Sequence, residues 1–149
     1  MKIALTMTGG PALAAALRAM PEAASKKIVN GALRSAGDEL AARMAGYMPR
    51  SPEAPHVADH VVVQTVTTIG DVDGSKRPLL PDEYAVAVGP AKDFFYWFFR
   101  EFGTVHKAAS PAMRPAFDQT AARCLAIVVE VLGASIAATA AAGGRGGGA

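Results

Sequence analysis

Few residues of this 149-residue chain have the types and spacing that catalysis or metal binding requires. The histidines His56, His60 and His106 are scattered, and none has a second ligand at a zinc-type spacing. The stretch DVDG from Asp71 starts like a calcium loop but lacks the closing glutamate. The chain also contains no Gly-x-Ser-x-Gly elbow and no phosphate-binding loop. The sequence therefore predicts no catalytic residue, no cofactor and no metal site.

Glu101 is the one carboxylate in a strongly apolar stretch. In a low-dielectric setting it could serve as an acid or base, which is the basis of a hydrolase interpretation. The pattern favours a structural carboxylate that binds Arg100, Arg114 or backbone amides of the turn at Gly103. Gly103 follows an apolar element and starts a polar loop, so we expect it to have a positive φ angle.

The element that must position Glu101 is a run of aromatic residues. Seven of the ten aromatic residues of the chain lie within nine positions. They are Phe94, Phe95, Tyr96, Trp97, Phe98, Phe99 and Phe102. The run is too short to cross a bilayer, and we expect no other window to reach that length. Either it supplies large side chains to the core or it forms a patch for a partner, and the small size of the domain favours the core.

Length and composition predict one domain over residues 1–142 and a flexible glycine-rich tail over residues 143–149. The net charge of +2 is too small to indicate a basic surface that would bind nucleic acid strongly on its own. Cys124 is the one cysteine, which fits a reducing cytoplasm, and its apolar helix predicts a buried side chain. The start of the chain does not have the pattern of a secretory signal.

Hydrophobic periodicity predicts an α+β fold in which a small antiparallel sheet with a long hairpin packs against two long helices. Strands are expected near residues 2–8, 60–69 and 84–89, long helices near 22–47 and 112–140, and a short helix near 12–20. The hairpin tip from Asp71 to Asp82 contains few large apolar side chains, so we expect it to be mobile in an isolated subunit.

The final helix is apolar over an arc too wide for one contact. Phe117, Ala121, Cys124, Val128 and Val131 form one stripe of this helix. Leu125, Val129, Leu132 and Ile136 form a second stripe. Because a lone small domain offers limited cover, the second stripe is a candidate subunit interface. Ser110 is available to cap the start of this helix.

The order of motifs resembles the tail-component family of long-tailed bacteriophages, prophages and gene transfer agents, also called tail-completion or head-tail joining proteins. The resemblance lies in an aromatic segment, a Glu-Phe-Gly-Thr turn and a Pro-x-Met-Arg-Pro-Ala-Phe entry into the last helix. The matching residues are Glu101, Phe102, Gly103, Thr104, Pro111, Met113, Arg114, Pro115, Ala116 and Phe117. Family members usually have an aromatic residue after the first proline, where this chain has Ala112.

The resemblance implies a non-enzymatic structural protein of the virion neck or proximal tail, made in the host cytoplasm. It implies a ring around the DNA channel, with a hexamer favoured, that contacts other neck and tail proteins and, transiently, DNA, but no membrane. Lys76 and Arg77 at the hairpin tip would then be candidate channel residues. The alternative is a small-ligand-binding α+β domain from a mobile element, with the aromatic run lining a pocket.

Overall fold

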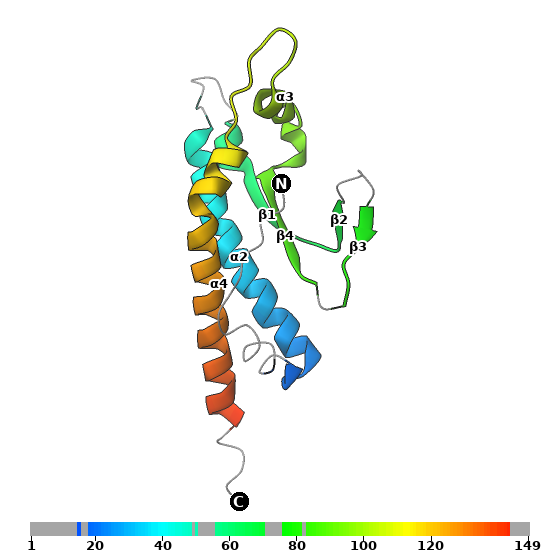
Figure 1. Cartoon of the computed structure of the whole chain (residues 1–149), viewed down its shortest axis with the longest axis vertical. Coiled ribbons are helices and arrows are strands. Elements are labelled where there is room, and N and C mark those ends of the chain that lie inside the picture. Colours follow the sequence, from blue (N-terminus) through cyan, green and yellow to red (C-terminus); the bar gives the residue numbers. More distant parts are fainter. Residues whose placement is uncertain are drawn as a thin grey trace, which may run out of the picture.

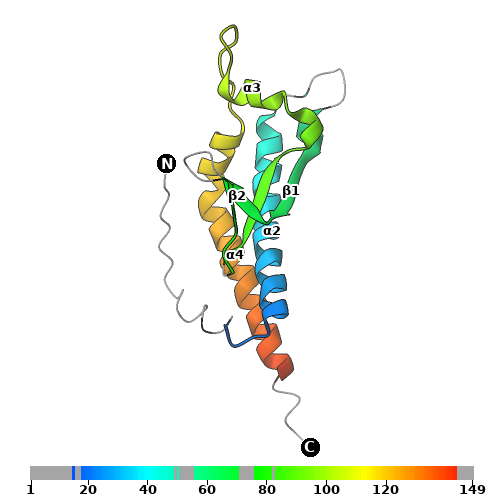
Figure 2. The same ribbon diagram turned by 90° about the vertical axis from the view of Figure 1, so that its right-hand side faces the viewer.

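The computed structural model describes residues 15, 18–48, 50, 56–70, 76–81 and 83–143. Over these residues the chain has the expected α+β fold, in which two long helices pack against a small antiparallel sheet (Figures 1 and 2). The strand predicted at 2–8, most of the short helix predicted at 12–20 and the tail after Gly143 lie outside the described residues.

The two long helices are α2 (Glu22–Tyr47) and α4 (Met113–Gly143). They run antiparallel and lie side by side in both views (Figures 1 and 2). The chain leaves α2 at Met48, directly before a proline, because a residue in that position disfavours helical geometry. Cys124 of α4 is half-buried, and its Sγ lies 3.4 Å from the carbonyl oxygen of Ala36 in α2.

Small side chains lie at the contact between these helices. Ala32 and Ala36 of α2 and Ala116 and Thr120 of α4 are buried. The hydroxyl group of Thr120 donates a hydrogen bond to the carbonyl oxygen of Ala116, so burial leaves it satisfied. Because alanine adds little bulk beyond the backbone, the two helices can approach closely.

The main sheet consists of β1 (Val61–Val66) and β4 (Ala85–Pro90), paired antiparallel with Val63 opposite Val88. Gly37 of α2 is buried beneath this sheet. A Cβ atom on Gly37 would lie 2.7 Å from a methyl group of Val63, so the absence of a side chain permits the close approach of α2.

The prediction of one continuous strand over residues 60–69 is wrong, because the segment forms two strands that pair with different partners. The change of partner occurs at Thr67. After β1, the residues of β2 (Thr68–Gly70) pair with β3 (Lys76–Pro78) and not with β4. The N–H of Leu79 donates to the carbonyl oxygen of Thr67 at 2.9 Å and closes this second hairpin. The part of the expected hairpin tip that forms β3 is therefore regular, whereas residues 71–75 and 82 lie outside the described residues.

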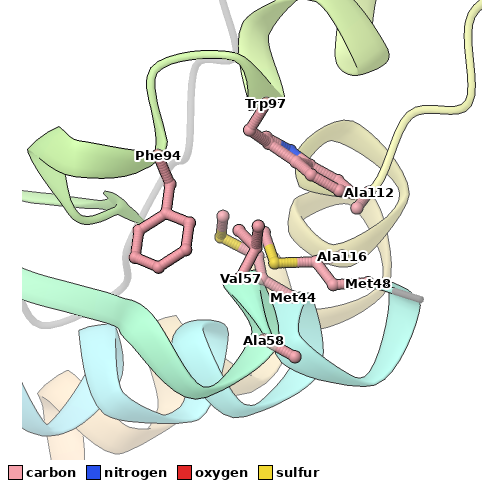
Figure 3. Close-up of a cluster of buried hydrophobic side chains, with 8 residues drawn as sticks. All are labelled: Met44, Met48, Val57, Ala58, Phe94, Trp97, Ala112 and Ala116. Carbon is pink, nitrogen blue, oxygen red and sulfur yellow. The ribbon is translucent and has the colours of Figure 1, made fainter. Parts of the chain in front are cut away.

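A cluster of apolar side chains forms the core at the end of the molecule where α2 ends and α4 begins (Figure 3). Three short elements contribute to this end, namely η1 (Val57–His60), η2 (Lys92–Phe94) and α3 (Trp97–Phe102). The buried members are Met44, Met48, Val57, Ala58, Phe94, Trp97, Ala112 and Ala116. Methionine and alanine dominate this list, and the aromatic run supplies two of its side chains.

Candidate functional site

The aromatic run lies mostly on the outside of the molecule, which corrects the expectation that it fills the core. Phe94 and Trp97 are buried, but the other five aromatic residues are 47–74% exposed. These five are Phe95, Tyr96, Phe98, Phe99 and Phe102, and we call them the aromatic surface. Large aromatic side chains are rarely left in water in such a group, which makes this surface the leading candidate for an interaction site.

The helical period of α3 explains which aromatic residues are buried. Trp97 and Glu101 are four positions apart, so they share one helix face, and both are buried. Phe98 and Phe102 share the next face, which points to solvent. Their ring centroids are 4.6 Å apart. The guanidinium carbon of Arg100 lies 5.4 Å from the centre of the Trp97 ring, a cation–π distance.

Glu101 caps the N-terminus of α4 from a different helix. One of its carboxylate oxygens accepts a hydrogen bond from the backbone N–H of Ala112 at 2.7 Å. The N–H groups of Met113 and Arg114 also donate to the carboxylate, each at 3.2 Å. A helix N-terminus has unpaired donors and a partial positive charge, so an anionic acceptor stabilises it.

These contacts identify Glu101 as a structural carboxylate, with one correction. Its partners are the amides that begin α4, and not the amides of the Gly103 turn or the side chains of Arg100 and Arg114. Glu101 also takes the capping role expected of Ser110. The backbone N–H of Ser110 instead donates to the carbonyl oxygen of Arg100 at 2.8 Å.

The segment between α3 and α4 projects beyond the body of the molecule in both views (Figures 1 and 2). Gly103 has the expected positive φ angle, 78°. A Cβ atom there would lie 2.8 Å from the backbone nitrogen of Ala109, so another residue would be strained. Two backbone hydrogen bonds pair Thr104 with Lys107, and Val105 at the tip is 97% exposed.

Both halves of the sequence motif meet in this one unit. Glu101 to Thr104 end α3 and begin the projecting segment, and Pro111 to Phe117 begin α4 where Glu101 binds. Ala112, which stands where an aromatic residue was expected, is fully buried. Trp97 lies over Ala112 in Figure 3. Both residues belong to the buried cluster, so a larger side chain at position 112 would need space within this core.

One of the four residues predicted to form a subunit interface on α4 is covered within the subunit itself. Val129 is 43% exposed, and Leu125 and Ile136 are half-buried. Leu132 is buried, with 6% of its surface exposed, so it belongs to the folded subunit rather than to a free surface. Both apolar stripes have the same period, so periodicity could not tell which residues would be covered within the chain.

By length and composition alone, α4 could cross a membrane between Met113 and Thr139, because an 18-residue window within this stretch has a mean hydropathy of 1.8. The expectation that no window reaches that length is therefore wrong, because the charged residues of α4 are too widely spaced to interrupt it. However, α2 lies alongside α4 and exposes charged side chains, among them Lys27, Arg34 and Arg43. A bilayer around both helices would have to desolvate these charges.

The hairpin-tip cations Lys76 and Arg77 differ in their surroundings. Lys76 is exposed in β3. The guanidinium group of Arg77 forms a bidentate pair with Glu83, at 2.5 and 2.8 Å. This hydrogen bonding, together with a bond from the N–H of Leu80, lowers the pKa of Glu83 to about 2. Arg77 thus holds the hairpin to the start of β4 and is not a free cation.

Other site types receive little support from the described residues. A hollow of about 450 Å³ is lined by Glu39, Ala42, Arg43, Gly46 and Tyr47, all in α2, and not by the aromatic run. Among the residues that the structure describes, no group of three His, Cys, Asp or Glu side chains could hold a metal ion.

Comparisons with known proteins identified no relative of this chain. No family model matches the chain, and no curated protein and no solved structure matches it.

Proposed function

We propose that this chain is a non-enzymatic virion protein that joins or completes the tail at the head-tail junction of a phage-like particle. In this role it works as a ring around the DNA channel. The proposal rests on the resemblance of the Glu101–Thr104 and Pro111–Phe117 motifs to the tail-component family.

One structural observation supports the proposal most directly. The carboxylate of Glu101 binds the first backbone amides of α4, so the two separate motifs form one physical unit. The two motifs are six residues apart in the sequence, and their contact through Glu101 gives them a shared structural role. The unit holds the aromatic surface at one end of the molecule, where an assembly protein can present it to another subunit.

Deletion of the gene tests the proposal. We expect the lysate to contain capsids and tails that each assemble but do not join, and electron microscopy with particle counting measures the joined fraction. A plasmid-borne copy of the gene should restore joined, infectious particles. A normal number of joined particles in the deletion lysate would refute the proposed role.

A substitution on α4 extends this test. Val129→Asp places a carboxylate on an exposed position and should reduce joining if this face is a subunit contact. Leu132→Asp is unsuitable, because Leu132 is buried and its replacement would unfold the subunit. Thr139→Asp places the same charge at an exposed position of the same helix outside this face, so it is the matched control and should leave joining intact.

The ligand-binding alternative requires the aromatic run to line a pocket. Five of its seven side chains are exposed, and the hollow described above is lined by α2 alone, so the head-tail role is the proposal that we develop. Titration with a small apolar dye still separates the two functions, since a pocket saturates at a fixed stoichiometry whereas a ring component shows concentration-dependent assembly.

A further inference from the structure

The aromatic surface is large enough to be half of a protein interface. Aromatic side chains bury about 150–250 Å² each when fully covered, and the five members are 47–74% exposed. Together they present roughly 600 Å² of mostly apolar area, by the same estimate. A standard interface buries about 800 Å² on each partner. A few neighbouring residues would complete such an area.

The subunit also exposes a second apolar surface, which lies on α4. Ala122, Ala126, Val129 and Gly133 are exposed on α4, and their spacing of three or four positions places them on one side of the helix. We call them the α4 outer face. They lie away from the buried positions Ala116 and Thr120, and in Figure 1 α4 forms one edge of the molecule.

The two surfaces are complementary in shape and charge. The aromatic surface consists of large protruding rings, whereas the α4 outer face has small side chains between which rings can seat. The exposed charged residues beside the aromatic surface, two basic and one acidic, sum to +1: Lys92, Asp93 and Lys107. Those beside the α4 outer face, two acidic and one basic, sum to −1: Asp118, Arg123 and Glu130. Opposite charges at the rim favour this pairing over contact between two identical surfaces.

A single chain cannot make this contact with itself. The aromatic surface is at the end of the molecule where α3 lies (Figure 1). The α4 outer face begins nine residues along α4, at Ala122, and α4 leads away from that end. Contact between different faces of successive copies is heterologous, and repetition of such a contact closes a ring when the rotation between copies allows it.

We propose that the aromatic surface docks on the α4 outer face of a second copy of this chain. The inference rests on the proposed function, because a ring needs a heterologous contact, and it names the two surfaces that make that contact. Phe98 and Phe99 are its central anchors, since both are more than half exposed and adjacent in sequence.

Two complementary variants of the full chain test the inference. Phe98→Asp disables the aromatic surface, and Ala126→Arg disables the α4 outer face. Sedimentation velocity measures self-association over a range of concentrations. We expect each variant to associate more than about tenfold more weakly than the unmodified chain. Circular dichroism melting checks that both variants fold, which is expected because both positions are exposed.

The decisive sample is an equimolar mixture of the two variants. Each then supplies the surface that the other lacks, so the mixture should form heterodimers that extend no further. The double variant should pair with neither the unmodified chain nor a second copy of itself. Leu80→Asp, at an exposed position on the link between β3 and β4, is the control and should associate like the unmodified chain.

Three results would overturn the inference. The unmodified chain could remain monomeric at its highest soluble concentration, the mixture could fail to form heterodimers, or Ala126→Arg could associate normally. The gene deletion reports separately on function. Failure to join particles without self-association would refute this contact alone, and self-association with normal joining in the deletion lysate would refute the head-tail role alone.

Discussion

The helical body and the α3 end of this molecule use side-chain size in opposite ways. Where α2 meets α4 and the sheet, the buried positions are small residues such as Ala32, Ala36 and Gly37. At the α3 end, five large aromatic side chains face solvent, and Phe95 is 74% exposed. In most small domains the large aromatic residues are inside.

This difference indicates that the two regions meet different requirements. Small residues let backbones approach closely, so the body gains its stability from extended helix and sheet contacts within one subunit. The α3 end keeps Phe94 and Trp97 as anchors and exposes the remaining rings at some cost in solubility. Such exposure is expected where a second surface covers the rings in the assembled state.

The largest expected effect comes from neighbouring aromatic residues that differ in burial. Trp97 is 3% exposed, and Trp97→Ala should lower the free energy of unfolding by about 3–5 kcal/mol, because it leaves a cavity in the core. Phe98→Ala should change it by less than about 0.5 kcal/mol. Urea denaturation followed by circular dichroism measures both values. Equal effects would remove the distinction between anchors and surface.

Glu101 joins the two regions, and its removal should have the next largest effect. Glu101→Ala leaves the buried N–H of Ala112 and the N–H groups of Met113 and Arg114 without their acceptor. We expect a loss of about 2–3 kcal/mol. Glu101→Gln keeps one acceptor oxygen and should cost less. Glu130→Ala, an exposed position on α4, is the control. A stability unchanged by Glu101→Ala would contradict the capping role.

Within the body, two glycines of α2 test whether close approach matters. Gly37→Ala should destabilise the fold by about 1–3 kcal/mol, because the new methyl group overlaps with the stiff side chain of Val63. Gly31→Ala meets no atom within 4 Å and should stabilise α2 by about 0.5–1 kcal/mol. Thermal melting of both variants decides the matter, and a stabilising shift for Gly37→Ala as well as for Gly31→Ala would show that packing at Gly37 is loose.

The smallest effect concerns the β2–β3 hairpin, which belongs to neither region. Arg77 holds the pKa of Glu83 at about 2 rather than its ordinary 4.5. A lowered folded-state pKa means that the stabilisation is present above about pH 4.5 and is lost as the pH falls towards 2. Both side chains are about one-third exposed, so salt should weaken the effect.

Carbon-13 chemical shifts of the Glu83 carboxyl group measure this titration. We expect a midpoint well below the ordinary value of 4.5. Hairpin amide shifts should follow the same midpoint, and in Glu83→Gln this transition should disappear. A Glu83 midpoint near 4.5 would show that the pair with Arg77 does not persist in solution.

Local patterns were sufficient to predict much of the fold. The helix expected at residues 22–47 matches α2, and the one near 112–140 matches α4 to within a few residues. Gly103 has the positive φ angle expected from its place between an apolar element and a polar loop. Each of these features depends on residues close together in sequence, so periodicity and turn chemistry report them.

Apart from the overlooked length of the apolar window in α4, the errors concern relations between distant residues. The 60–69 segment divides at Thr67, because its second half pairs with β3 rather than β4. Leu132 is buried and Val129 is not, although both lie in the same apolar stripe. The spacing of Trp97 and Glu101 was an available signal that these two residues share the inner face of α3, but the spacing alone did not reveal which face was inner.

The sequence by itself determined the secondary structure, the α+β class and the motifs that carry the resemblance, because these depend on local backbone preference and residue order. Only the tertiary structure decided that the aromatic run is mostly outside, that Glu101 caps α4 and that Arg77 is paired. Burial and long-range pairing depend on which surfaces meet in space. An apolar side chain has the same hydrophobicity whether its partner lies in its own chain or in another.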